Sequence, residues 1–554
     1  MRRLGFLTLI PLSAGVIGLT VGALWLVGSS SGQRERFSSL EIAPADPVFY
    51  MAINTEPSSS QWIAVSDVLG TLNAKEPLRD AIDEELLKFG LEFERDILPL
   101  AGDEGYVAIT DIDALADETA GLVAAFRLRD PAEAEQILLS VAGQEGTEFT
   151  EEDYEGVTIR EAHDATDGDP NDDGAISFVD DVMVVGASPE DVSGVIDVIQ
   201  GRVPNAETDE RLAAMRERQT EDFLVWGYAD LTQLWGYLET YLQENAPEDF
   251  QSSFNSEQFL RQARDNYDQL TFALSSRGDG FVFDYSYIVP PQSSDKLGLG
   301  VPFDPRYAER VPADTMFFFA GNDLYRQGYL PGQDEVFDTP GPQGETVKDI
   351  VEGIESELGI DLENDLLSLM TGEVAVAGNA SNLGAGEPEF EVLALAEVND
   401  AAKVENTMRK LGDFLEREDL ATVEDSERDG VHRWSAAQAP DSAAWTVTGE
   451  EVILGYPEAA LEGFLDGQEE SLADTADWKR TMEILPGQRT SVAYISLARL
   501  IQEVRQIEGT EANFEQSTEG RVTLDDLAPI RALGFATTTM ADGYSARVVV
   551  LIAD

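Results

Sequence analysis

Short apolar strands and amphipathic helices occur along the chain in two series that follow the same order. The first series opens with the apolar strand IAPADPVFYMAIN from Ile42, and the second opens with RVPADTMFFFAGN from Arg310. A helix follows in the first series, because Leu78, Ile82 and Leu86 stand at i, i+4 and i+8. The second series carries VKDIVEGIESELG at the matching place, again with one apolar face. The pattern predicts one structural module that occurs twice.

A short acidic helix that runs straight into a strand is the clearest matched pair. KFGLEFERDILPLAGDEGYVAI at residues 88–109 matches ELGIDLENDLLSLMTGEVAVAG at residues 357–378, with Asp96 opposite Asp365. Each Asp is followed by an apolar pair at helical spacing from other apolar residues. We therefore expect the acids to face solvent and the apolar side to seat this helix on a sheet.

Later segments also match in order. Asp130 and Asp400 each follow an apolar strand where a helix N-cap belongs, and Pro131 takes the first helical position. Each series closes with a hairpin that has Asp-Gly at its turn. Strands joined by short turns predict an α+β fold of two tandem copies of an antiparallel sheet, with helices packed on one face of each.

An uncharged run at the N-terminus predicts one transmembrane helix. Arg2 and Arg3 precede about 25 uncharged residues, LGFLTLIPLSAGVIGLTVGALWLVG, enough to cross a hydrocarbon core of about 30 Å. The run is longer than the roughly 7–15 apolar residues of a cleaved signal peptide, which is the alternative. The two Arg place the N-terminus in the cytoplasm by the positive-inside rule. The bulk of the chain is then extracytoplasmic, in the periplasm or at the cell surface.

These observations set the expected organisation of the chain. It comprises a transmembrane anchor at 1–28, a stalk at 29–38, a first module at 39–289, a linker at 290–305 and a second module at 306–554.

The charge balance excludes one class of partner. With Lys+Arg 37 against Asp+Glu 106, the formal net charge is −69, and such a surface repels the phosphate backbone of nucleic acids. Because the acids are spread along the chain, they favour a solvated acidic surface over a patch for cations or a basic partner. With Cys 0 and His 2, the composition also excludes disulfides, thiolate sites, Cys nucleophiles and multi-His metal sites.

One acidic segment resembles a calcium loop. DPNDDGAISFVD at residues 169–180 has oxygen ligands at positions 1, 3, 5 and 12 and Gly at position 6 of an EF-hand loop. The second series has a strand where this loop continues, so only a partial site is expected. The alternatives are a solvated acidic loop and a Ca²⁺ site with the ligands Asp167, Asp169, Asn171 and Asp173.

Other residues form no convergent catalytic set. His432 fits a partly buried structural histidine, and the stripe through Leu231, Leu234 and Trp235 fits core packing. No nucleophile-elbow, Walker, zincin or kinase pattern occurs in the sequence. We therefore expect no enzyme activity, no catalytic residue and no organic cofactor.

The anchor, the PAD-x-x-F openings at Pro44 and Pro312, and the paired G-[LI]-[ED]-[FL]-E-x-D-[IL]-L segments resemble a known family. It comprises uncharacterised membrane-anchored proteins, common in cyanobacteria, that carry a large domain of unknown function. The resemblance covers the chain from about residue 38 and implies an envelope location without an assigned activity.

Two functions remain open from the sequence. The first is a non-enzymatic binding or scaffolding role in the cell envelope, with an envelope protein as partner. The second is a carrier or sensor of an apolar ligand held in a cavity between sheet and helices. A pocket lined by apolar side chains in either module would favour the second function.

Overall fold

The computed structural model describes residues 37–112, 121–164, 174–219, 221–245, 264, 267–290, 300–323, 353, 355–356, 358–383, 388–418, 421–425, 431–435, 442–507, 509–517 and 523–553. The chain divides into two compact units, Met1–Pro291 with Asp554, and Gln292–Ala553. The expected anchor at 1–28 lies outside the described residues, and none of the described helices is long and apolar enough to span a membrane.

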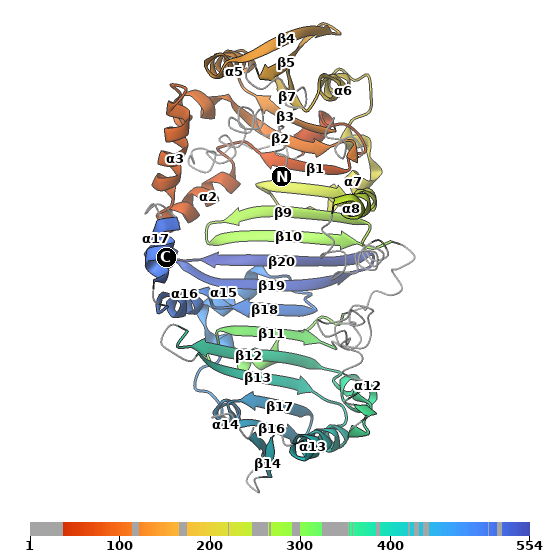
Figure 1. Ribbon diagram of the computed structural model, residues 1–554, viewed down its shortest axis with the longest axis vertical. Coiled ribbons are helices and arrows are strands. Elements are labelled where there is room, and N and C mark those ends of the chain that lie inside the picture. Colours follow the sequence, from red (N-terminus) through yellow and green to blue (C-terminus); the bar gives the residue numbers. More distant parts are fainter. Residues whose placement is uncertain are drawn as a thin grey trace. The chain divides into compact units, whose positions relative to one another are not determined.

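The described strands of the first unit pair antiparallel in the order β4-β5-β6-β7-β3-β2-β1-β8-β9-β10 (Figure 1). Their bounds are β1 Phe49–Asn54, β2 Ala101–Ile109, β3 Leu122–Leu128, β4 Thr147–Tyr154, β5 Val157–Asp164, β6 Gly174–Val179, β7 Val182–Gly186, β8 Val225–Asp230, β9 Gln269–Arg277 and β10 Gly280–Ile288. The expected hairpin at the Asp-Gly turn before β10 is confirmed, and Asp180-Asp181 form the turn of a second hairpin, between β6 and β7.

The helices of the first unit pack on both faces of its paired strands. Side chains alternate between faces along a strand, so Tyr106 and Val107 of β2 point in opposite directions. Tyr106 lies in a core with α6 and α7, whereas Val107 lies on the side of α5. The α-helices are α2 Ser60–Thr71, α3 Lys75–Leu87, α5 Pro131–Glu145, α6 Pro189–Ile199, α7 Glu210–Arg218 and α8 Leu231–Asn245.

The expectation that helices cover one face is therefore wrong. The physical reason lies in the central strands, where runs such as FYMAI in β1 and LVAAF in β3 are apolar at successive positions. Such strands present apolar side chains to both faces, and both faces need cover from water.

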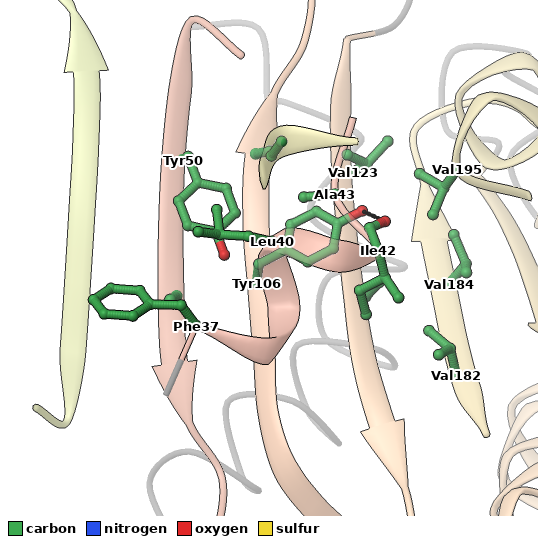
Figure 2. Packing of buried hydrophobic residues seen from close by; sticks show 14 of the residues in the cluster. Phe37, Leu40, Ile42, Ala43, Tyr50, Tyr106, Val123, Val182, Val184 and Val195 are labelled. Atoms are coloured by element: carbon green, nitrogen blue, oxygen red, sulfur yellow. Dashed lines mark hydrogen bonds between the residues drawn. The ribbon is translucent and has the colours of Figure 1, made fainter. Parts of the chain in front are cut away.

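A short 3₁₀ helix precedes the first strand and closes one of these cores. This entry helix, η3 (Ser38–Glu41), is followed by Ile42. Figure 2 shows Leu40 lying against Tyr50 and Tyr106, and the Tyr106 hydroxyl donates to the Ile42 carbonyl at 3.2 Å. The Phe37 ring packs against Phe223 and Trp226, with centroids 5.2 Å from each.

The described strands of the second unit also pair antiparallel, in the order β14-β15-β16-β17-β13-β12-β11-β18-β19-β20. Position for position, this order has the pattern of the first unit (Figure 1). The bounds are β11 Phe317–Asn322, β12 Glu373–Ser381, β13 Glu389–Glu397, β14 Thr422–Asp425, β15 Val431–Ser435, β16 Ser442–Thr448, β17 Glu451–Tyr456, β18 Ser491–Ile495, β19 Ile530–Met540 and β20 Gly543–Ile552.

Helices again lie on both faces in the second unit. Val404 and Met408 of α13 pack with Ala396 of β13, while Trp478 of α15 meets Phe318 edge-on on the opposite face, with ring centroids 5.3 Å apart. The helices are the entry helix η9 Arg306–Glu309, α12 Leu362–Asp365, α13 Ala401–Arg417, α14 Glu458–Asp466, α15 Ala476–Ile484, α16 Leu497–Arg505 and α17 Thr510–Ser517.

The matched acidic helices have the predicted form. In the first unit η4 (Phe93–Ile97) and η5 (Leu98–Leu100) run directly into β2, and in the second unit α12 and η11 (Leu367–Leu369) lead to β12. Ile97 is buried, whereas Asp96 is partly exposed and accepts a hydrogen bond from the Glu92 amide at 2.8 Å. Asp365 accepts from the Asp361 amide in the same way, at 3.0 Å.

Candidate ligand pocket

Helix α5 forms one wall of an apolar cavity in the first unit, and its first turn is fixed by local signals in the sequence. Asp130 caps the helix by accepting from the Glu133 amide at 3.0 Å, and Pro131 supplies a first residue with the helical φ. The Arg129 amide donates to the Leu100 carbonyl at 2.9 Å. This bond ties the start of α5 to η5, so that the two helices meet over the strands.

The cavity lies where α5 and η5 meet β2, β3 and β7. Its volume is about 50 Å³. At roughly 10–15 Å³ for each water, this is space for about four water-sized groups. Nine of the eleven lining residues are apolar, namely Ile97, Leu100, Ala101, Phe126, Leu128, Ala134, Ile137, Leu138 and Met183. The interior is therefore suited to a hydrocarbon group rather than to ordered water.

The polar lining residues are Thr55 and Arg127, and among the described residues the buried Nε of Arg127 has no hydrogen-bond partner. The Thr55 hydroxyl donates to the Gly102 carbonyl at 3.2 Å. Arg127 lies between Phe126 and Leu128 in β3, so its side chain leaves the strand on the opposite face. There its guanidinium pairs with Glu41 of η3 at 3.1 Å and with Asp181 at 3.4 Å.

Two residues that come next in the sequence after lining residues form an ion pair with each other. Glu56, next to Thr55, meets the guanidinium of Arg129, next to Leu128, at 2.5 Å. Burial alone would raise the pKa of Glu56, but hydrogen bonds from Ser58 and the charge of Arg129 hold that pKa below its ordinary value. The pair is therefore ionised at neutral pH.

A bulge at the start of β2 shapes this region. Ala101 pairs with Leu128, but the next described pair is Gly105 with Phe126, so β2 carries extra residues there. A side chain at Gly102 would lie 2.4 Å from the Arg127 carbonyl oxygen, which only glycine avoids. Bulges of this kind bend a strand and re-aim its side chains. Glu104, just after the bulge, lies opposite Asn54 of β1 and on the same face of β2 as Tyr106.

Glu104 and its counterpart Glu373 are buried carboxylates that hold the entry helices. Glu104 accepts hydrogen bonds from the amides of Phe37 at 3.1 Å and Ser39 at 3.3 Å. Glu373 accepts from the amides of Arg306 at 2.9 Å and Tyr307 at 3.2 Å. The side chains of Glu104 and Glu373 are 0% and 2% exposed. Both acids therefore satisfy backbone donors at the start of a short helix.

Burial also changes the acidity of Glu373. Desolvation raises its pKa to about 7, against hydrogen bonds from the Tyr307 and Arg306 amides and the charge of Arg306, which lower it. Sequence reasoning did not single out either glutamate. The signal was present, since Glu104 and Glu373 occupy the same place in the matched segments 88–109 and 357–378.

Each entry helix also makes an ion pair with a strand residue, and the signs are reversed between the units. In the first unit Arg127 of β3 pairs with Glu41 of η3. In the second unit Glu397 of β13 pairs with Arg306 of η9.

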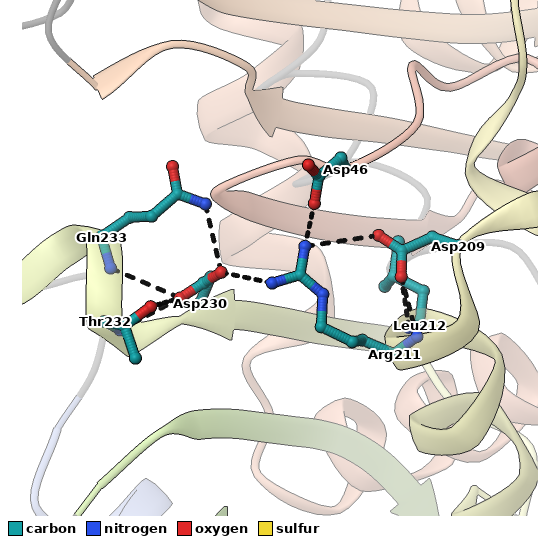
Figure 3. Close-up of polar contacts among 7 residues, drawn as sticks. All are labelled: Asp46, Asp209, Arg211, Leu212, Asp230, Thr232 and Gln233. Atoms are coloured by element: carbon teal, nitrogen blue, oxygen red, sulfur yellow. Dashed lines mark hydrogen bonds and ion pairs between the residues drawn. The ribbon is translucent and has the colours of Figure 1, made fainter.

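A polar network around Arg211 joins two helix N-termini. Figure 3 shows the guanidinium between Asp46, Asp209 and Asp230. Asp209 caps α7, and Asp230 accepts from the Thr232 and Gln233 amides at the start of α8. The carboxylates thus serve as caps, and Arg211 offsets their charge.

The residues predicted as calcium ligands, Asp167, Asp169, Asn171 and Asp173, lie outside the described residues. The residues that follow them form β6, in which the Ser177 hydroxyl donates to the Thr158 carbonyl at 2.9 Å. Asp180 stands in the exposed hairpin turn with φ 52°. A complete EF-hand loop through position 12 is therefore excluded, as expected. Within the described ranges, no three or more acidic or histidine side chains are grouped to hold a metal ion.

His432 lies between α13 and the strands of the second unit. Its ring stacks on Trp445 with centroids 4.3 Å apart, and its Nε2 lies 3.2 Å from a Glu405 carboxylate oxygen. This partly buried setting agrees with the structural role expected for it. In the α8 stripe, Leu231 is buried, and Leu234 and Trp235 are half-buried.

Comparisons with known proteins give a match along nearly the whole chain. The model of a family described as "Protein of unknown function (DUF3352)" matches residues 10–552. No curated protein matches. Among solved structures, crystal form I of TP0453 aligns with 10% identity and a TM-score of 0.24, covering 46% of this chain and 79% of that chain. Crystal form III of TP0453 aligns with 11% identity and a TM-score of 0.25, covering 50% of this chain and 91% of that chain. Scores of this size do not establish a shared fold.

Proposed function

The chain belongs to the DUF3352 family of proteins of unknown function, and we propose that its first unit is a binding module that takes an apolar group into the pocket under α5. The observation that carries this proposal is the cavity of about 50 Å³ lined by nine apolar residues. Apolar concave sites between helices and sheets are the usual places for small ligands. Such a role needs no catalytic residue, in agreement with the non-enzymatic function expected from the sequence.

The side chains at matching positions of the second unit support the interpretation that the cavity is a specific pocket rather than a defect in core packing. We propose that the two units are copies of one module, because their strands pair in the same order. The residue after η5 is Ala101, and the residue after η11 is Met370. The fourth residue after the N-cap is Ala134 in α5 and Val404 in α13. At both places the second unit therefore carries the larger side chain.

A large aromatic residue also occupies this core in the second unit. Trp445 of β16 corresponds to Ile176 of β6, since each follows an alanine paired with a glycine. Trp445 is buried in one cluster with Val404 and Met408, with Met370 packed against it. Phe126 of the first unit corresponds to Ala396, which offsets part of this difference. The two copies thus distribute volume differently at the same site.

The size of the cavity limits the group that enters it. About four methylenes at ~0.8 kcal/mol each give about 3 kcal/mol of transfer free energy. A small isolated ligand then binds with a Kd on the order of millimolar. A larger molecule that inserts only one end would gain further contacts outside the pocket.

We further propose that this module acts outside the cytoplasm, held at a membrane by the uncharged run at residues 1–28. Support for this location comes from the sequence, through the length of the run and the Arg2-Arg3 pair before it. A periplasmic or cell-surface position would give the pocket access to lipids and other apolar envelope molecules.

The binding of 1-hexanol tests the pocket directly. Full-length protein, labelled at methionine methyl groups and held in lipid nanodiscs, is titrated with 1-hexanol and followed by NMR, with the free hexanol concentration corrected for uptake by empty nanodiscs. The Met183 methyl signal should shift and saturate in the millimolar range. Ala134→Phe fills the cavity and should abolish the shift. The matched control is Ala132→Phe, which adds the same ring on the exposed side of α5.

A second variant guards against a folding defect. Ala101→Met with Ala134→Val introduces the residues of the second unit and should also remove the shift. Circular dichroism and the urea midpoint check that each variant is folded. Saturable binding that persists in both folded variants would place the ligand elsewhere and end the proposal.

A further inference from the structure

We infer that the pocket under α5 selects uncharged apolar molecules and rejects carboxylates of the same chain length. This inference rests on the proposed function, and it names the chemical class of the ligand. It follows from the state of the two arginines next to the pocket, from the polar group of Thr55 and from the charge of the chain.

Both arginines near the cavity are already paired with carboxylates. Arg129 is held by Glu56 at 2.5 Å. Arg127 is held by Glu41 and Asp181 on the opposite face of the strands. A ligand carboxylate that approached the half-exposed guanidinium of Arg129 would have to share it with Glu56. Two carboxylates beside one cation repel each other, so Arg129 attracts a ligand anion less than an unpaired arginine would.

The interior offers no substitute for this cation. Of the two polar residues that line the cavity, Thr55 gives its hydroxyl proton to Gly102, and Arg127 directs its charge away. The nine other lining residues carry apolar side chains. A carboxylate drawn toward the cavity would therefore lose its hydration and meet only a cation that Glu41 and Asp181 already pair.

The field of the whole chain acts in the same direction. The formal net charge of −69 makes the approach of any anion unfavourable, most of all at low ionic strength. A neutral molecule of the same length meets neither the electrostatic repulsion nor the cost of removing water from a carboxylate. The expected ligands are therefore alcohols, esters, hydrocarbons or aromatic molecules without a negative charge.

A matched pair of probes, 1-hexanol and hexanoate, tests this selectivity. Hexanoate is ionised at neutral pH, and the two molecules have the same alkyl chain. In the Met183 methyl titration, we expect hexanoate to bind at least tenfold more weakly than hexanol. The ratio of the hexanoate Kd to the hexanol Kd should fall in high salt, because salt screens the long-range repulsion between hexanoate and the acidic chain. Equal or tighter binding of hexanoate would overturn the inference.

Glu56→Gln provides the decisive variant. It releases Arg129 from its partner, so hexanoate binding should strengthen severalfold while hexanol binding stays the same. The control Glu41→Gln removes the corresponding acid from Arg127 on the opposite face and should change neither. Unchanged hexanoate binding in Glu56→Gln would contradict the role of the ion pair, and retained hexanol binding shows that the variant is folded.

The two proposals fail in different ways. If neither probe shifts Met183, the pocket does not bind apolar groups and the proposed function falls. If hexanol binds and the Ala134→Phe variant removes it, but hexanoate binds equally well, only the selectivity is wrong.

Discussion

At the scale of single residues, the two buried glutamates show how one side chain can fix a segment of backbone. Glu373 accepts two amide hydrogen bonds from η9 in a site that is almost closed to water. The hydrogen bonds favour its charged form, and burial opposes it. Because burial is the larger effect, the pKa of Glu373 rises to about 7.

This raised pKa predicts a pH dependence of stability with a definite sign. The folded chain binds the Glu373 proton more tightly than the unfolded chain, in which the pKa is near 4.5. The contribution is fully present below about pH 4.5 and is lost as the pH rises through about 7. It amounts to at most about 3 kcal/mol of unfolding free energy.

Urea unfolding of Glu373→Gln checks this expectation. The substitution removes the titrating group, so the fall in unfolding free energy between about pH 5 and pH 8 should become shallower than in the wild type. Glu450→Gln, in an exposed hairpin turn, is the matched control and should keep the wild-type slope. A Glu373→Gln protein with the wild-type slope would show that another group titrates.

Single residues also mark a limit of sequence reasoning. The chain has 106 Asp and Glu residues, so an acid at any one position carries little information. Only the match between segments 88–109 and 357–378 could single out Glu104 and Glu373, because they occupy the same place in both segments. The pocket left no such signal, since it arises where Ala101 and Ala134 are small rather than where a distinctive residue is present.

At the scale of elements, local sequence signals such as N-cap residues predicted the helices better than hydrophobic periodicity predicted which sheet faces the helices cover. The N-caps at Asp130 and Asp400 are confirmed, as are the acidic helices that run into β2 and β12. These features depend on a few neighbouring residues. The faces covered by helices depend instead on packing between distant segments. The one-sided arrangement was therefore wrong, although the apolar runs of β1 and β3 are the sequence features of strands buried on both sides.

The cap of α5 gives a prediction at this scale. Asp130→Ala removes the acceptor for the Glu133 amide and should lower the unfolding free energy by about 1 kcal/mol. The urea midpoint measures the loss. Asp130→Asn keeps a side-chain acceptor and should lose much less. Equal losses in the two variants would mean that the charge of Asp130, rather than its hydrogen bond, is what stabilises the helix.

At the scale of the whole molecule, the net charge dominates the response to solution conditions. With a formal charge of −69, mutual repulsion of the acids destabilises the folded chain. Raising the salt from about 0.01 M to about 1 M shortens the screening length from about 30 Å to about 3 Å.

Thermal unfolding should therefore shift upward with salt. Each kcal/mol gained raises the Tm by roughly 2–4 °C in a domain of this size, and we expect a rise of several degrees. Circular dichroism measures it, with NaCl and KCl compared to separate screening from binding of one cation. A Tm that falls with salt would show that the surface ion pairs outweigh the repulsion.

The reversed ion pairs of the entry helices have a consequence for assembly of the chain. If η3 settled on the second unit, Glu397 would lose the cation that Arg306 supplies, and if η9 settled on the first, Arg127 would lose the carboxylate of Glu41. Each misplacement removes a native ion pair, although a buried glutamate receives the entry helix in both units. Repeated modules are prone to such exchange while they fold. The two ion pairs thus favour the seating of each entry helix on its own unit.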